Sequence, residues 1–210
     1  MSRHSHPRQH ATGRFTRLRV VLAAGLVLGV GATVTLASWN DSETSTAAFT
    51  AGQFDIVGST DGTTFAQHAT AATAAGLTFS APVTAMSPGS TAYSLFRVKT
   101  LAGSVAGTLG LTAAAPNATS GTGLGAALTY GVKTIAGTTC DAAAYAAGTA
   151  VVAAGSPVTT GQAAGSTVAV TANGAAPVNY CFAVTLPQTA GNEVQGKTGT
   201  LAWTFTATSA

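Results

Sequence analysis

The sequence predicts an all-β protein, an antiparallel β-sandwich or barrel with one or two short helices. Apolar and polar residues alternate with a period of two, and the clearest alternating runs are rich in aromatic and β-branched residues. Clusters of Gly, Pro, Asn, Asp and Ser, such as "TDGT", "SPGS" and "ANGAAP", separate these runs. Many short strands between such turns are typical of sandwiches and barrels.

A polar leader and an apolar run precede the β-rich part. Residues 1–19 contain five Arg and no acidic residue, and residues 20–36 are apolar. Small residues, among them Ala37, stand where a signal peptidase reads its substrate. We therefore expect a signal peptide over residues 1–37, cleaved before Ser38, with membrane contact only through the uncleaved leader. Because the apolar run approaches the length of a transmembrane helix, a retained N-terminal anchor is the alternative.

The rest of the chain, residues 38–210, reads as one β-sandwich domain without tandem repeats or an internal linker. The strongest strand patterns are residues 180–186 and 201–206, where large apolar side chains occupy every second position. Both are expected to be half-buried strands. Weaker candidates for strands are residues 77–79, 93–101, 108–112, 127–135 and 167–171.

One stretch is typical of a helix instead. In "CDAAAYAAG", residues 140–148, Asp141 is suited to cap the first turn, the alanines favour a helix, and Gly148 is suited to end it. We predict a short surface helix here. Residues 65–75 are compatible with either a second short helix or a loop.

The two cysteines, Cys140 and Cys181, both follow the leader, in a chain predicted to enter an oxidising space. A disulfide between them is the first expectation, and it would pin the short helix to the strand at 180–186. A zinc site is the alternative, but zinc takes about four ligands and His68 is the only histidine after the leader.

The formal charge of +3 comes from the leader. From Ser38 onward there are four basic and six acidic residues, a balance of 4 − 6 = −2. A nucleic-acid-binding protein carries a basic patch, so we expect no nucleic-acid partner. The basic residues are Arg97, Lys99, Lys133 and Lys197, and the acidic ones are Asp41, Glu43, Asp55, Asp61, Asp141 and Glu193.

The sequence carries little that points to catalysis. His68 has no zinc-protease motif, hydrolase elbow or acidic cluster around it, so we expect a solvated side chain, no catalytic residue and no metal or other cofactor. Asp55 and Asp61 flank a predicted turn, where sharing a cation is the alternative to two solvated carboxylates. Asn40 and Asn117 match the glycosylation sequon, a short pattern that is common by chance.

Three stretches together resemble the TasA/camelysin family of secreted bacterial biofilm-matrix proteins, whose leader is cut by a dedicated SipW-type signal peptidase. They are "WNDSETSTAAFTAGQFDI" at 39–56, "MSPGSTAYSLFRVKTLAGS" at 86–104 and "NEVQGKTGTLAWTFTATSA" at 192–210. They cover roughly a third of the chain, and residues 102–176 depart from the Lys/Asp-rich body usual in that family.

The resemblance implies a jelly-roll sandwich, cleavage by that signal peptidase, export to the extracellular matrix or cell surface, and assembly into fibres. In such fibres the N-terminal segment of each subunit completes a sheet of the next. The camelysin branch has also been labelled a metalloprotease, but no zinc-ligand set exists in this sequence.

We therefore expect a secreted structural subunit whose partner is another copy of itself. The predicted donor is residues 38–50, and the assembly residues are Trp39, Asn40, Asp41, Phe49 and Phe54. The alternatives for this segment are packing onto its own sheet and a disordered tail. The alternatives for the whole chain are a monomeric secreted or cell-surface adhesin and, less favoured, a secreted metalloprotease.

Overall fold

A computed structural model describes residues 13–34, 40–80, 83, 85–113 and 123–210, which fall into two compact units, Met1–Phe49 and Thr50–Ala210. In the first unit, helix α1 spans Gly13–Val34. The side chains described within this helix, from Phe15 to Leu26, are all exposed. Among the described residues, no helix combines the length and the apolar character needed to cross a membrane.

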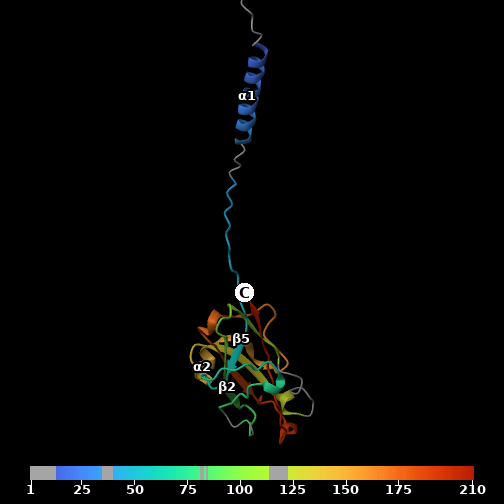
Figure 1. The fold of residues 1–210 in the computed structure, drawn as a ribbon. Helices are drawn as coiled ribbons and strands as arrows, with labels where there is room; N and C mark the ends of the chain where they lie inside the picture. Colours follow the sequence, from blue (N-terminus) through green and yellow to red (C-terminus); the bar gives the residue numbers. More distant parts are fainter. Residues whose placement is uncertain (1–12, 35–39, 81–82, 84, 114–122) are drawn as a thin grey trace, which may run out of the picture. The chain divides into compact units, whose positions relative to one another are not determined.

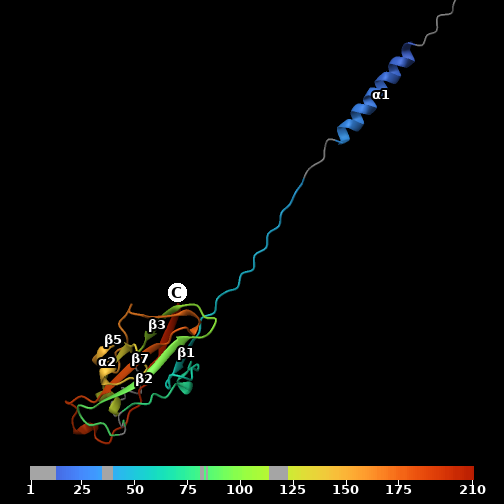
Figure 2. The ribbon, with the colours of Figure 1, turned by 90° about the vertical axis from the view of Figure 1, so that its left-hand side faces the viewer.

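The second unit is an all-β sandwich, as the sequence predicts (Figures 1 and 2). Its described residues contain eight strands in two antiparallel sheets, one in the order β1-β2-β7-β4-β5 and the other in the order β6-β3-β8. The strands are β1 (Ile56–Ser59), β2 (Thr91–Thr100), β3 (Gly107–Leu111), β4 (Thr129–Ile135), β5 (Thr149–Pro157), β6 (Val168–Val170), β7 (Val178–Thr185) and β8 (Phe205–Ser209). The short helices are α2 (Ala142–Ala147) and the 3-10 turns η1 (Ala71–Thr73), η3 (Leu124–Ala127), η4 (Ala172–Gly174) and η5 (Asn192–Val194).

The strand order is that of a jelly roll with one change. A jelly roll arranges eight antiparallel strands in two sheets, and its first strand normally pairs with its last. Here β1 pairs with β2 instead, with Ile56 opposite Thr100 and Ser59 opposite Arg97. As a result, β8 pairs only with β3 among the described residues and forms an edge of the smaller sheet.

The core lies between the two sheets and depends on aromatic contacts across them. Phe205 of β8 packs against Tyr180 of β7 with ring centroids 4.7 Å apart, and against Phe96 of β2 at 5.4 Å. Trp203, just before β8, packs against Phe182 at 4.9 Å. Tyr180 and Phe182 are fully buried, and a fully buried side chain of this size contributes roughly 1.5–3 kcal/mol to stability. Phe96, Trp203 and Phe205 are half-buried and pack against this core, so the aromatic contacts help to hold the sheets together.

The larger sheet is also covered on part of its outer face. Asp141 caps α2 by accepting a hydrogen bond from the Ala144 N–H at 2.8 Å, and Tyr145 of the helix is buried against the sheet. A disulfide joins Cys140 to Cys181 at the centre of β7, with Cα atoms 5.3 Å apart. The helix, its cap and this disulfide were all predicted from the sequence and are confirmed.

Several strand predictions need correction. The strand predicted at 180–186 exists as β7, but it is buried on both faces rather than half-buried, because α2 and Cys140 cover its outer face. Residues 77–79 are not a strand, and residues 201–204 alternate in burial without belonging to β8. Residues 65–75, for which the sequence left a short helix and a loop open, form a loop that contains the 3-10 turn η1 and an isolated β-bridge from Ala66 to Gly58. Strand β5 was not predicted at all.

Candidate functional site

An apolar cavity of about 930 Å³ lies between the sheets, beside the edge formed by β8. Phe96 of β2 and Phe182 of β7 line one side, and Leu201, Trp203 and Phe205 line another. A size of this order is typical of ligand sites, which measure roughly 300–1,000 Å³. Because aromatic and aliphatic side chains dominate the lining, the cavity suits an apolar occupant.

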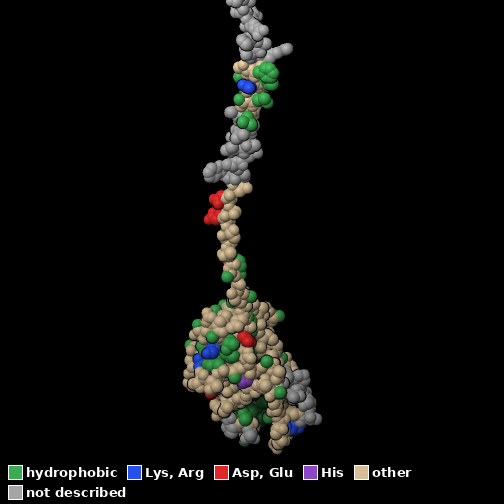
Figure 3. Space-filling model, in the orientation of Figure 1, with side chains coloured by type: hydrophobic (Ala, Val, Ile, Leu, Met, Phe, Trp, Pro, Cys, Tyr) green, Lys and Arg blue, Asp and Glu red, His purple; other side chains and the backbone are tan. Residues whose placement is uncertain are grey.

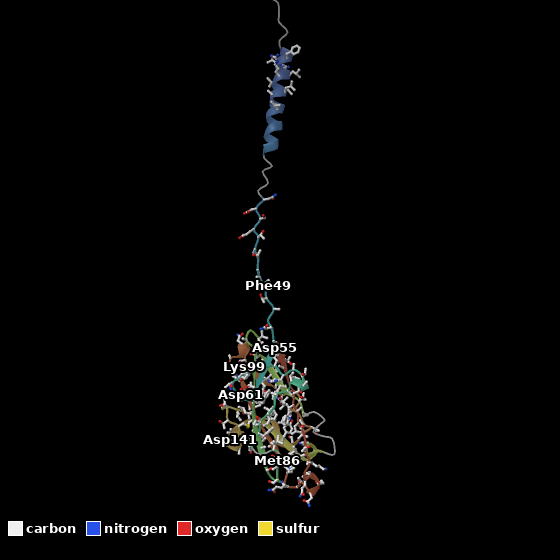
Figure 4. All side chains as sticks on the ribbon, turned by 60° about the horizontal axis from the view of Figure 1, so that its bottom comes forward. Phe49, Asp55, Asp61, Met86, Lys99 and Asp141 are labelled. Carbon is white, nitrogen blue, oxygen red and sulfur yellow. A yellow bond between two sulfur atoms is a disulfide. The ribbon has the colours of Figure 1, made fainter. Side chains whose placement is uncertain are left out.

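The cavity extends along the sandwich and has a polar end. The polar residues Asp55, Gln67 and His68 line the cavity, and so does the apolar Met86. Figure 4 shows Asp55 and Met86 well separated along the length of the domain. The site is therefore an elongated groove, which we call the β8 groove.

The backbone next to the β8 groove presents unpaired hydrogen-bonding groups. The Thr112 N–H donates to the Thr204 carbonyl at 2.9 Å, and the Ala210 N–H donates to the Ala106 carbonyl at 3.0 Å. Even-numbered residues of this segment therefore direct their backbone groups toward β3, and odd-numbered residues direct theirs the opposite way. Those odd-numbered residues are Leu201, Trp203, Phe205, Ala207 and Ser209.

The odd-numbered residues thus present both apolar side chains and backbone hydrogen-bonding groups to a molecule bound in the groove. Leu201, Trp203, Phe205 and Ala207 turn their side chains toward the core, whereas the even-numbered residues between them are exposed. No hydrogen bond of the Leu201 or Trp203 backbone occurs within the described part of the chain. A lipid or small apolar molecule would leave this row of N–H and C=O groups unsatisfied, whereas a β-strand would satisfy it.

Trp203 is held in place at the wall of the groove. Its ring lies 5.7 Å from that of Tyr130, centroid to centroid, and the Tyr130 hydroxyl donates to the Thr160 carbonyl. Burial raises the pKa of Tyr130 to about 12, although the neighbouring Trp203 indole opposes this rise. The Trp203 Nε1 atom is itself buried and makes no hydrogen bond of ordinary geometry in the described structure.

The structure describes some of the predicted assembly residues but not all of them. Ala37, Ser38 and Trp39 lie outside the described residues. Residues 40–53 are exposed, and Phe49 stands in an extended stretch with 93% of its surface accessible (Figure 4). Phe54 differs, since it is half-buried and its ring lies over Gly107 of the compact domain.

Asp55 and Asp61, for which a shared cation was the alternative to two solvated carboxylates, accept different hydrogen bonds. The Asp61 carboxylate accepts hydrogen bonds from the N–H groups of Thr63 and Thr64 and from the Ser59 hydroxyl. These bonds, the Thr63 N–H first, hold the pKa of Asp61 far below its usual range. Asp55 instead accepts a hydrogen bond from the Gln67 side-chain amide at 2.8 Å.

The candidate catalytic and metal-binding groups remain dispersed. His68 is exposed, and its Nδ1 atom lies 2.8 Å from the Thr73 carbonyl oxygen. In the part of the chain that the structure describes, no three His, Cys, Asp or Glu side chains gather as a metal site would require. Cys140 and Cys181 form the disulfide and so are not free to bind a metal. Asn117, in the second glycosylation sequon, lies outside the described residues.

Charged side chains are sparse on the visible face of the domain (Figure 3). Lys99 Nζ lies 4.2 Å from the centroid of the Phe65 ring, and Arg97 is 5.7 Å from it. Arg97 also donates to the Asn179 side chain at 2.8 Å and to the Gly62 carbonyl. These two cations therefore pack within the domain's own surface rather than forming an open anion site.

The sequence pattern at 201–206 predicted a strand with an apolar face, but not the groove beside it. Phe96 and Phe182 were read only as strand residues. The groove arises because β1 lies in the other sheet, and that pairing choice has no signature in the local pattern. The sequence matches no protein-family model, and a search of curated proteins finds no match to it.

Proposed function

We propose that this chain is a secreted structural subunit that assembles head-to-tail into extracellular fibres. The N-terminal segment of one copy adds a strand beside β8 of the next and fills the β8 groove. The observation that carries this proposal is the row of backbone groups at Leu201, Trp203 and Phe205, which have no backbone partner on the side away from β3 among the described residues, next to an apolar cavity. Strand addition satisfies the backbone groups for affinity and fills side-chain pockets for register.

The donor segment has the properties that such an insertion needs. Residues 40–50 are exposed, and they carry Ala47 and Phe49 at strand spacing, so both would face the same side when extended. Phe49 supplies a large apolar side chain for the groove. Trp39, which lies outside the described residues, is the second candidate anchor. A contact of donor with acceptor is heterologous, so it does not close on itself and propagates into a filament.

Export is part of the same proposal. The Cys140–Cys181 disulfide is typical of proteins in oxidising compartments. Helix α1 carries three of the five leader arginines and most of the apolar run read as a signal peptide. The uncleaved leader would keep the donor segment tethered until the chain has left the cell. The TasA/camelysin resemblance supports this function, with self as the partner and a signal peptidase acting during export.

A second function has one observation in its favour. A cavity of about 930 Å³ in a single copy also suits an adhesin or binding module that takes an apolar ligand without polymerising. The unpaired backbone at Trp203 favours a strand over such a ligand. We propose no enzymatic activity, since His68 is exposed and bonded only within its own loop.

Strand donation is tested by removing residues 38–50, the whole predicted donor, from the exported chain and comparing it with Trp39→Ala and Phe49→Ser. Electron microscopy and size-exclusion chromatography of the purified proteins report assembly. We expect no filaments from the truncated chain and shorter or slower ones from the single variants. Filaments from the truncated chain that match those of the parent would eliminate strand donation and leave the monomeric binding module as the better function.

A further inference from the structure

One wall of the β8 groove is a covering segment rather than a strand. Residues 67–79, which we call the strap, run between β1 and β2, and most of them line the cavity. The strap is anchored at both ends. Before it, Ala66 exchanges two backbone hydrogen bonds with Gly58, of 2.9 and 3.0 Å, and near its end the Ser94 hydroxyl donates to the Thr78 carbonyl at 2.9 Å.

Between these anchors the strap is held loosely. Within the described residues, a single side-chain hydrogen bond, from Gln67 to Asp55, ties it to the rest of the domain. The other hydrogen bonds of this stretch, His68 with Thr73 and Thr70 with Thr73, stay inside the strap. Every described side chain from Gln67 to Ala74 is exposed, whereas Leu77 and Phe79 are half-buried against the core.

We propose that the strap is a gate over the β8 groove, closed in the free subunit and lifted when an apolar segment enters. Segments with few buried contacts and exposed hydrogen bonds open at the lowest free-energy cost in a folded protein. Phe96, Trp203 and Phe205 are half-buried, and lifting the strap without an occupant would expose more of their apolar surface to water, so the closed form is favoured until an occupant covers them.

The Gln67–Asp55 hydrogen bond is the latch of this gate. It is the tie that must break before residues 68–76 can move away from the cavity, whereas the anchors at Ala66 and Thr78 can persist as hinges. The identity of the entering segment rests on the proposed function, but the gate itself does not. Access to the groove is therefore measurable in the absence of any assembly.

Trp203 provides the probe, because Trp39 is the only other tryptophan in the chain. In a Trp39→Phe background, fluorescence quenching by trichloroethanol reports how readily a small apolar molecule reaches the groove. We expect Gln67→Ala to raise the quenching constant several-fold. Gln53→Ala is the matched control, because Gln53 also donates one exposed hydrogen bond, to the Ala102 carbonyl at 3.1 Å, but does not touch the strap.

A staple tests the opposite direction. In the variant Asp55→Cys/Gln67→Cys, a short thiol cross-linker fixes the latch, and the same protein with both new thiols alkylated is the control. We expect the quenching of Trp203 in the cross-linked protein to fall below the level of the Trp39→Phe parent. Equal quenching in wild type and Gln67→Ala, an equal rise in Gln53→Ala, or no effect of the staple each overturns the gate.

Assembly separates the two proposals. With Trp39 restored, Gln67→Ala should shorten the lag before filaments appear and the staple should lengthen it. Filaments whose lag does not respond to either change contradict the gate while strand donation stands. If no variant forms filaments but quenching responds as expected, the gate stands and the proposed function fails.

Discussion

The Trp203 indole packs against the Phe182 ring with their centroids 4.9 Å apart, and this contact joins the segment before β8 to the centre of the larger sheet. The same two side chains line the β8 groove. The wall of the candidate site is thus also part of the core. Truncating the fully buried Phe182 ring would cost roughly 3–5 kcal/mol of stability, and truncating the half-buried Trp203 ring would also destabilise the domain. A substitution that removes a backbone N–H at the open edge of β8, rather than one of these rings, therefore tests assembly without disrupting the core.

Replacing both Cys140 and Cys181 by Ala should lower the free energy of unfolding by about 4 kcal/mol. The disulfide closes a loop with a sequence separation of 41, which restricts the unfolded chain. Chemical denaturation of the double variant beside the parent measures the difference. Two free thiols in mass spectrometry of the non-reduced parent would contradict the disulfide itself.

Gly107→Ala should destabilise the domain by about 1–3 kcal/mol through overpacking. A Cβ atom at this position would come 2.8 Å from the Phe54 ring and closer still to the Thr208 carbonyl oxygen, which belongs to the backbone and moves least easily. Gly137→Ala is the control, because a Cβ there meets nothing within 4 Å. Thermal unfolding of the two variants should separate them, and equal midpoints would show that Phe54 and β8 are not packed as described.

Asp61 should stay ionised at about pH 3, where an ordinary aspartate is largely protonated. Its lowered pKa follows from the hydrogen bonds donated by Thr63, Thr64 and Ser59. Because the folded-state pKa lies below the unfolded value, its stabilising effect is complete above about pH 4 and is lost as the pH falls toward the folded-state pKa. NMR titration of the side-chain carboxyl measures this pKa directly, and a midpoint near 4 would be incompatible with the turn.

His68→Ala should leave the stability of the domain nearly unchanged. Neither the parent nor this variant should hydrolyse casein. The side chain is exposed and bonded only to the Thr73 carbonyl of its own loop. Thermal unfolding and a casein assay, each with and without a chelator, provide the measurements. Chelator-sensitive cleavage by the purified parent that disappears in His68→Ala would reinstate the protease alternative.

Local patterns predicted those parts of the fold that depend on neighbours in sequence. The period-two run before the C-terminus, the Asp141 cap and the turn at Gly89 are such features, and Gly89 adopts the positive φ of 89° that its "SPGS" turn requires. Strand β5 escaped prediction because Ala, Gly and Ser dominate its second half, and its ladder with β4 shifts register.

Features that depend on tertiary contacts were beyond the sequence. Whether the outer face of β7 is wet or buried is decided by α2, which packs over Cys181 and Ala183. The β8 groove depends on the pairing of β1 with β2. That pairing is decided by the relative stability of β1 at two sheet edges, which the sequence of one strand does not reveal. The donor segment could be predicted as a candidate, but its acceptor could not.

Strand addition at β8 is tested most directly by mixing two half-competent subunits, one that lacks the donor segment and one that lacks a working acceptor edge. A chain lacking residues 38–50 keeps only the acceptor. Ala207→Pro keeps only the donor, because proline removes an N–H that points away from β3 and blocks the open edge. Thr206→Ala, which leaves that N–H in place, is the control and should polymerise like the parent. In analytical ultracentrifugation, we predict that each half-competent subunit alone is monomeric and that an equimolar mixture forms dimers but no longer species. Filaments from Ala207→Pro alone, or a mixture that stays monomeric, would contradict strand addition at β8.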